Sequence, residues 1–184
     1  MTALENIKIL DLTRFVAGPF CTQLLADMGA EVIKIESPDR GDETRHQGAI
    51  VDGESWYFAG LNRNKKSLTL DLKSPEGKEI FRRLAAGADA VVENFRPGVM
   101  RNFGFDYESL NKINPRIVYC GISGFGKDGP YALRPAFDFI AQGLSGFMSI
   151  TGFPDREPVR TGIPSTFAAS WRMPGSRLVP PVRD

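Results

Sequence analysis

The spacing of apolar residues changes twice within the first 36 positions. A short β-rich run at 7–12 is followed over 19–28 by apolar residues at helical spacing, and a second β-rich run covers 31–36. Pro19 opens the middle segment and Gly29 follows it, an asymmetry typical of helix ends. A strand, a helix and a strand within roughly thirty residues form a βαβ unit, whose strands are parallel and whose crossover is almost always right-handed.

The same alternation continues toward residue 148. Ser74 and Pro75 suit the N-cap and the first position of a helix that runs to about Ala86. The other predicted elements are strands over 67–71, 88–93 and 116–122 and helices over 96–103, 106–113 and 138–148. This alternation predicts an α/β fold, a Rossmann-like parallel sheet with helices on both faces.

Ligands of such sheets bind at the carboxyl ends of the strands, in the loops that follow them. Four loops follow predicted strands in this chain, at 14–19, 37–45, 94–98 and 124–130. We therefore expect a ligand site among these four loops.

Composition narrows the possible partners. The chain has 184 residues, of which 42% are hydrophobic and 24% charged, and its formal net charge is +1. These values fit one ordinary globular domain, and near-neutral charge argues against nucleic acid or an anionic membrane as partner. We see no apolar run as long as a membrane span and no signal peptide, so we expect a cytoplasmic protein.

Few residues offer metal or triad chemistry. Cys21 and Cys120 form no metal-binding pattern, and we expect both to be reduced thiols in the core. His46 is the single histidine, so a histidine metal site or a Ser-His-Asp triad would rest on one residue in a polar loop. We therefore expect no metal site.

The last twenty residues differ from the rest. Residues 165–184 contain three prolines and three arginines and show no helical or strand period. We divide the chain into a first unit over 1–164 and a tail over 165–184 that we expect to be disordered.

Six motifs follow one another along the first unit. They read Ile-Leu-Asp-Leu-Thr-Arg-Phe-Val-Ala-Gly-Pro at 9–19, Leu-Ala-Asp-Met-Gly-Ala-Glu-Val-Ile-Lys-Ile-Glu at 25–36, Gly-Asp-Glu-Thr-Arg at 41–45, Asn-Arg-Asn-Lys-Lys-Ser at 62–67, Glu-Asn-Phe-Arg-Pro-Gly at 93–98 and Gly-Phe-Gly-Lys-Asp-Gly-Pro at 124–130. Through these motifs the chain resembles the family III CoA-transferases over about residues 4–163.

The resemblance implies that this chain is the N-terminal, truncated part of the family's large CoA-binding domain. It implies transfer of coenzyme A (CoA) between an acyl-CoA thioester and a free carboxylic acid. CoA would be a substrate, and no metal, nicotinamide or flavin is implied. Full-length relatives form homodimers, so a second copy of the complete protein is an implied partner.

The resemblance also places ten residues at the CoA site. Val16 and Ala17 would lie against CoA, and Lys73 near a phosphate. In the loop that begins at Asn94, an amide offers both donor and acceptor, an aromatic ring offers a stacking face, and a helix N-terminus favours anions. The ten residues are Val16, Ala17, Leu70, Lys73, Asn94, Phe95, Arg96, Asn102, Arg134 and Asp138.

Each assignment has a plainer alternative. The turn at 14–19 is also a simple strand-to-helix connection, and Lys73 a solvated lysine. Arg40 and Arg45 suit phosphate, but an exposed charged loop is the commoner account. Asp138 would serve equally as a helix cap. Asn102 stands where some relatives carry a phosphate-contacting arginine, and here an arginine precedes it at position 101.

The chain departs from the family pattern near its end. In this family an aspartate attacks the acyl-CoA thioester and carries the acyl group, then CoA, before the acceptor carboxylate is activated. The resemblance puts it five residues beyond the glycine of the segment Pro158–Gly162, where this chain has Phe167. We therefore expect no catalytic residue here, and a frameshift or gene-fragment product that is inactive alone.

Alternative functions follow from the same observations. The chain could be a CoA-transferase relative without turnover, a non-catalytic CoA-binding module, or a remnant without function. The 2-methylacyl-CoA racemases resemble it too, but they carry Gly-His-Asp where it has Ala136, Phe137 and Asp138. Because the histidine that acts as acid or base is absent, we rank racemase below transferase.

Overall fold

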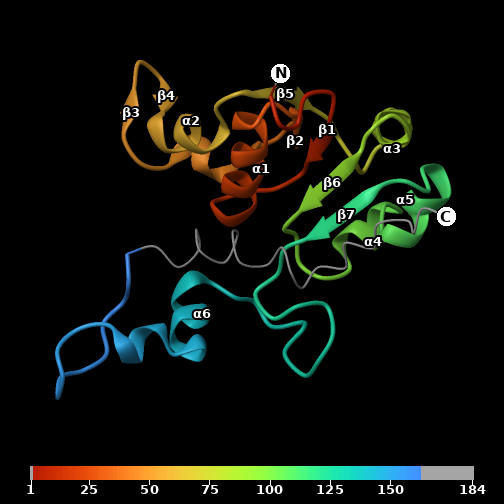
Figure 1. Ribbon diagram of the computed structural model, residues 1–184. Coiled ribbons are helices and arrows are strands. Elements are labelled where there is room, and N and C mark those ends of the chain that lie inside the picture. The colour runs from red at the N-terminus through yellow and green to blue at the C-terminus, as the bar shows by residue number, and fades with distance from the viewer. Residues whose placement is uncertain (1, 163–184) are drawn as a thin grey trace.

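The computed structural model describes residues 2–162, which contain a sheet of five parallel strands. The order across the sheet is β5-β2-β1-β6-β7 (Figure 1). Winding proceeds from β1 toward one edge and then crosses over to β6, so the switch point lies between β1 and β6. The strands are β1 (Lys8–Asp11), β2 (Glu31–Glu36), β5 (Lys65–Thr69), β6 (Ala90–Glu93) and β7 (Val118–Gly121).

Helices cover both faces of this sheet. Successive apolar side chains of a strand point to opposite faces, so each face needs a layer of helices to bury it. Ile9, Val32 and Val92 pack with Ala26 of α1 (Ala17–Asp27), which lies next to α2 (Trp56–Asn62). Leu10 and its neighbours on the opposite face pack against α3 (Pro75–Ala86), α4 (Val99–Phe103) and α5 (Tyr107–Ile113). The predicted α/β fold with a parallel sheet is confirmed.

Most predicted elements occur within two residues of their expected bounds; the exceptions are the helix predicted over 96–103, which begins at Val99 after the left-handed Gly98, and the helix predicted over 138–148. Ser74 caps α3 by accepting a hydrogen bond from the Gly77 N–H at 3.0 Å, as predicted. α1 begins at Ala17, so Pro19 occupies its third position rather than its first. The helix predicted over 138–148 is divided into α6 (Asp138–Ser145) and a 3-10 turn, η2 (Phe147–Ile150), because Gly146 between them is left-handed.

The segment between β2 and β5 holds structure that the sequence pattern did not predict. A 3-10 turn, η1 (Glu43–His46), precedes a hairpin of β3 (Ile50–Val51) and β4 (Glu54–Ser55). α2 then begins with the Ser55 hydroxyl accepting from the Phe58 N–H at 3.1 Å. These short elements lack the length on which periodicity depends.

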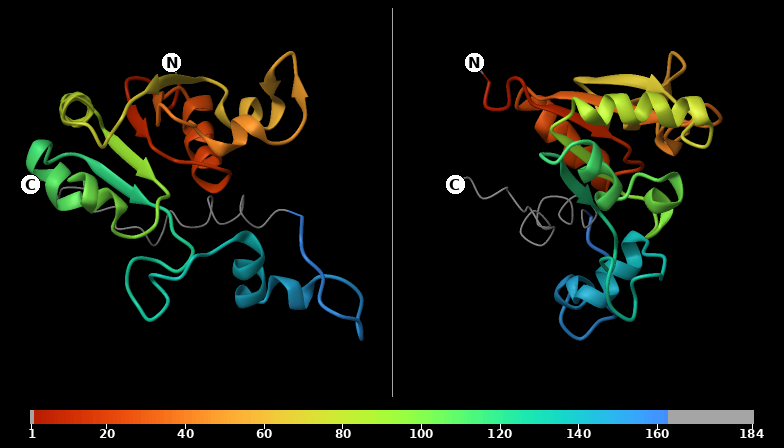
Figure 2. Two further views of the ribbon diagram at one scale, coloured as in Figure 1. Left: turned by 180° about the vertical axis from the view of Figure 1, so that it is seen from behind. Right: turned by 90° about the vertical axis from the view of Figure 1, so that its right-hand side faces the viewer.

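The chain after β7 leaves the sheet beyond the carboxyl ends of its strands, and the three views agree on this (Figures 1 and 2). It carries α6 and η2 and much of the exposed apolar surface. No helix among residues 2–162 is long and apolar enough to cross a membrane. Cys21 is buried and Cys120 is half-buried, and the two form no disulfide with each other; burial raises the pKa of the Cys21 thiol to about 11.

Candidate functional site

The turn after β1 and the loop after β6 meet at the switch point of the sheet. The Asn94 amide oxygen accepts a hydrogen bond from the Arg14 N–H at 2.8 Å, and its amide nitrogen donates to the Arg14 carbonyl at 2.7 Å. One side chain thus satisfies both backbone groups of a residue 80 positions away. This pair of bonds fixes the two loops relative to each other.

The Arg14 side chain links these loops to a third. Its Nη1 lies 3.2 Å from Oε1 of Glu43 in η1, and its guanidinium lies 5.5 Å from the centre of the Phe95 ring. The other Glu43 oxygen, Oε2, is buried and without a hydrogen-bond partner within residues 2–162. The carboxyl edge of the sheet therefore carries the Phe95 ring and the Arg14 guanidinium side by side, and Glu43 fixes the position of the guanidinium.

A buried ion pair lies directly beneath the turn. Lys34 Nζ contacts Oδ2 of Asp42 at 2.9 Å, and both side chains are essentially without exposed surface. Lys34 also donates to the Thr13 carbonyl at 2.8 Å, while Asp42 Oδ1 accepts from the Phe15 N–H at 3.2 Å. Burial alone would raise the pKa of Asp42, but the charge and hydrogen bond of Lys34 hold it below its ordinary value.

A second buried pair supports the start of α1. Lys65 Nζ lies 3.0 Å from Oδ2 of Asp11 and also donates to the Pro19 carbonyl at 2.9 Å. Asp11 accepts from the hydroxyl of Thr22 in α1 at 2.6 Å. Burial lowers the pKa of Lys65, and the neighbouring Asp11 opposes that shift. The two lysines thus bind backbone carbonyls at both ends of the turn.

The Arg45 side chain is bound within the protein, to Glu36. Its guanidinium donates twice to Glu36, from Nε at 2.9 Å and from Nη2 at 2.7 Å, and it lies 3.7 Å from the centre of the Phe58 ring. Glu36 is further bound by the Asp42 N–H. Despite burial, these donors hold the pKa of Glu36 below its usual value. The two explanations considered for Arg45 were phosphate binding and an exposed charged loop, and this internal pairing with Glu36 differs from both.

A third carboxyl group, Glu93, shapes the loop after β6. Its Oε2 accepts from the Phe95 N–H at 2.7 Å, and its Oε1 accepts from the Tyr119 hydroxyl at 3.0 Å. Burial raises the pKa of Glu93, and the two hydrogen bonds offset this only in part. The carboxyl group therefore anchors the loop at some cost in desolvation.

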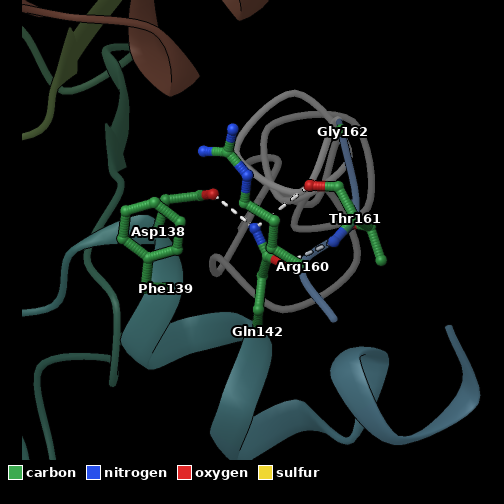
Figure 3. A pocket seen from close by; sticks show the side chains of 6 residues that line it. All are labelled: Asp138, Phe139, Gln142, Arg160, Thr161 and Gly162. Atoms are coloured by element: carbon green, nitrogen blue, oxygen red, sulfur yellow. Dashed lines mark hydrogen bonds between the residues drawn. The ribbon is translucent and has the colours of Figure 1, made fainter. Parts of the chain in front are cut away.

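A shallow cavity of about 230 Å³ lies beside α6 (Figure 3). The buried Gln142 closes one wall: its amide oxygen accepts from the Thr161 N–H at 2.9 Å, and its nitrogen donates to Asp138 at 2.6 Å. Arg160 lies over the Phe139 ring at 5.7 Å. The cavity is lined by Asp138, Phe139, Gln142, Arg160, Thr161 and Gly162.

Comparison with known proteins shows the family of the chain. A family model described as CoA-transferase family III matches residues 4–170. The chain belongs to CoA-transferase family III. It is 48% identical to the succinate–glutarate CoA-transferase of Agrobacterium fabrum over 167 residues, covering 87% of this chain and 42% of the relative. It is 49% identical to the acetyl-CoA:oxalate CoA-transferase of Acetobacter aceti over 158 residues, covering 86% of this chain and 41% of the relative.

A solved family structure has the same fold. A CaiB/BaiF family protein from Brucella suis superimposes with a TM-score of 0.87 at 47% identity, covering 92% of this chain and 47% of that one. The chain thus spans about two fifths of the length of the curated relatives named above and about half of the solved one. It corresponds to the N-terminal portion of family III proteins.

Five of the ten residues expected at the CoA site lie at the switch point. Val16 is the N-cap of α1 without a capping side chain, and Ala17 begins the helix. The Asn94 amide is hydrogen-bonded to both backbone groups of Arg14. Phe95 lies against the Arg14 guanidinium, and Arg96 is exposed.

The other five are more dispersed. Leu70 is a core residue that follows β5, and its N–H donates to the Glu36 carbonyl, while Lys73 is exposed. Asn102 is exposed on α4, and the neighbouring Arg101 pairs with Asp106 at 3.1 Å. Arg134 and Asp138 belong to the segment beyond the carboxyl edge.

The alternative considered for Asp138, a helix cap, is wrong. Phe137, not Asp138, is the N-cap of α6, so Asp138 is no cap; it accepts instead from Gln142. Arg134 lies 4.2 Å from the centre of the Tyr131 ring.

Gly124 makes a close approach to the segment that carries Arg134 and Asp138, since a Cβ there would lie 1.9 Å from the Cβ of Ala136.

The buried charges beneath the turn were missed by sequence reasoning, although a signal for them exists. Lys34 and Glu36 alternate with apolar residues in a strand whose side chains are mostly buried. A charge in such a strand requires a partner. The partners come from the loop that follows, at Asp42 and Arg45, which was interpreted as a surface loop.

Proposed function

We propose that this chain is the CoA-binding portion of a family III CoA-transferase, and that the complete protein transfers CoA between an acyl-CoA thioester and a free carboxylic acid. Family membership supports the reaction class, and the two relatives named above act on succinate, glutarate or oxalate by their names. The proposal includes dicarboxylic acids as acceptors and a homodimer for the complete protein.

The observation that carries the CoA-binding part is the reciprocal pairing of Asn94 with the Arg14 backbone. It joins two loops at the topological switch point, where open α/β sheets bind their ligands. The exposed Arg96 and Lys73 supply positive charge around this edge. The first turn of α1 offers backbone N–H groups, which favour phosphate and carbonyl oxygens.

We further propose that the chain does not transfer CoA by itself. The reaction needs a carboxylate nucleophile, and Phe167 occupies the position that the family pattern gives to the aspartate. That position lies outside the described residues, as does the boundary expected at 164, and both stay predictions. So do the proposed cytoplasmic location and the expected tail over 165–184.

Calorimetric titration with CoA tests the binding proposal. We expect saturable binding and a higher melting temperature in the presence of CoA. Asn94→Ala should weaken CoA binding about tenfold, because loss of one braced loop contact is worth about 1.4 kcal/mol. Asn114→Ala is the matched control, since Asn114 braces the Ala85 and Ala88 carbonyls far from the switch point.

The two variants separate a site effect from a general loss of stability. Asn114→Ala should lower the melting temperature and leave the CoA affinity unchanged. Equal losses of affinity in both variants, or no saturable binding by the wild-type chain, would reject the proposal. The same samples incubated with succinyl-CoA and glutarate should form no glutaryl-CoA; turnover above a protein-free blank would contradict the proposed inactivity.

A further inference from the structure

Phe15 has a backbone conformation that its side chain does not favour. Its φ is +62°, in the left-handed region where glycine and asparagine are common and bulky residues are rare. It directly precedes Val16, so its conformation sets where the chain enters α1. A left-handed phenylalanine persists only where its surroundings impose that conformation.

Two buried side chains bond to the backbone on either side of Arg14, whose own backbone groups are bonded to Asn94. Lys34 Nζ donates to the Thr13 carbonyl at 2.8 Å, and Asp42 Oδ1 accepts from the Phe15 N–H at 3.2 Å. Lys34 Nζ and Asp42 Oδ2 are also 2.9 Å apart, so the two side chains hold the backbone on both sides of Arg14 as one unit. We call the Lys34–Asp42 pair the clamp. Asp42 is held in turn by the backbone and hydroxyl of Thr44.

The clamp touches backbone groups of the turn as well as being buried. A buried ion pair is weak evidence for a stabilising role, because desolvation of the charges often cancels their attraction. Besides the contacts of Asp42 with Thr44, the pair makes two hydrogen bonds to the segment that leads into Val16 and Ala17. Its geometry therefore suits a role in positioning more than a role in the core.

We propose that Lys34 and Asp42 are positioning residues that hold the Thr13–Phe15 turn in the conformation that CoA binding requires. The inference rests on the proposed function, since it concerns the same site. Neither residue need touch CoA. They act through the turn, while Lys65, paired with Asp11, donates to the Pro19 carbonyl further along the chain.

A double-mutant cycle tests the clamp. Lys34→Met removes the grip on the Thr13 carbonyl, and we expect CoA to bind at least tenfold more weakly. Phe15→Asn places a residue that tolerates the left-handed conformation, so it should restore at least threefold of that loss in the Lys34→Met background. Asp42→Asn, which keeps an acceptor oxygen for the Phe15 N–H, should have a smaller effect than Lys34→Met and serves if Lys34→Met does not fold.

The outcomes decide between positioning and mere stability. Additive effects of Lys34→Met and Phe15→Asn, or a lower melting temperature with unchanged CoA affinity for both clamp variants, would overturn the proposal. Amide hydrogen exchange gives a readout without CoA: the Phe15 amide should exchange at least tenfold faster in Lys34→Met and by a smaller factor in Asp42→Asn, while amides of β7 stay unchanged. Unchanged exchange at Phe15 would refute the clamp, whereas absent CoA binding by the wild-type chain would refute only the proposed function.

Discussion

Glu93 is a carboxyl group whose surroundings disfavour its charged form. Burial raises its pKa, although it accepts hydrogen bonds from the Phe95 N–H and the Tyr119 hydroxyl. A carboxyl group with a raised pKa in the folded state is more easily protonated there than in the unfolded chain. Its contribution to stability is therefore fully present below the ordinary glutamate pKa of about 4.3 and is lost as pH rises through the folded value.

Glu93→Gln should remove this penalty. A glutamine can accept from the Phe95 N–H through its oxygen and donate to the Tyr119 hydroxyl through its nitrogen, so both partners stay satisfied. We expect Glu93→Gln to melt above the wild type at pH 7 and to lose that advantage below about pH 4. A difference in melting temperature that does not vary with pH would contradict this account.

Glu93→Ala is the control for the hydrogen bonds. It leaves the Phe95 N–H and the Tyr119 hydroxyl without their acceptor, which should destabilise the protein by about 1–3 kcal/mol in denaturant unfolding. A stabilised Glu93→Ala would show that the two hydrogen bonds contribute little.

Asn94 shows what sequence could and could not predict at a single residue. Its place after a buried strand predicted its position at the carboxyl edge of the sheet, and it lies there, bonded to Arg14 of the turn after β1. Its use of both amide groups on Arg14 could not be predicted, because that partner is 80 residues away and is determined by the crossover of the fold. Asn94 is therefore as much a brace between loops as a candidate ligand contact.

At the scale of elements, β5 shows the limit of periodicity. The alternation of leucines predicted a strand over 67–71, whereas the strand covers Lys65–Thr69. Lys65 is polar, but its ammonium is buried against Asp11, so it behaves as an interior residue. Leu70 still bonds to the Glu36 carbonyl just beyond the strand, which explains why the apolar pattern extends further.

The entry into α1 depends on a glycine for space. A Cβ at Gly18 would lie 2.3 Å from the Cβ of Thr13, too close for any small adjustment. Gly60, in α2, has no atom within 4 Å of its ideal Cβ position. Gly18 and Gly60 thus form a matched pair of glycines in helices: the first is required by its close approach to Thr13, and the second has no such neighbour.

Alanine at these two glycines should have opposite effects. Gly18→Ala should destabilise the protein by about 1–3 kcal/mol through overpacking against Thr13. Gly60→Ala should stabilise it by about 0.5–1 kcal/mol, because alanine is the better helix former. Denaturant unfolding monitored by circular dichroism measures both. The same sign of change for the two variants would show that close contact at Gly18 is not the controlling factor.

At the scale of the whole molecule, apolar surface is unevenly distributed. Exposed large apolar side chains gather between residues 131 and 159, where Leu133 is 85% and Ile150 81% exposed. This segment lies beyond the sheet, at the end of the described chain (Figure 1). The family III proteins to which the chain is similar are about twice as long, so in them further chain is available to cover such a surface.

This distribution predicts concentration-dependent self-association of the chain on its own. Contiguous apolar surface favours association because water is released from it on contact. Replacing two exposed members of this segment, Leu144→Ser together with Ile150→Ser, should shift the sedimentation of the chain toward the monomer at a given concentration. Ile80→Ser is the matched control, since Ile80 is exposed on α3, apart from this segment. Equal shifts for both variants would mean that general surface polarity, rather than the segment after β7, controls association. A monomeric wild-type chain at all concentrations would show that this surface is already covered by the chain itself.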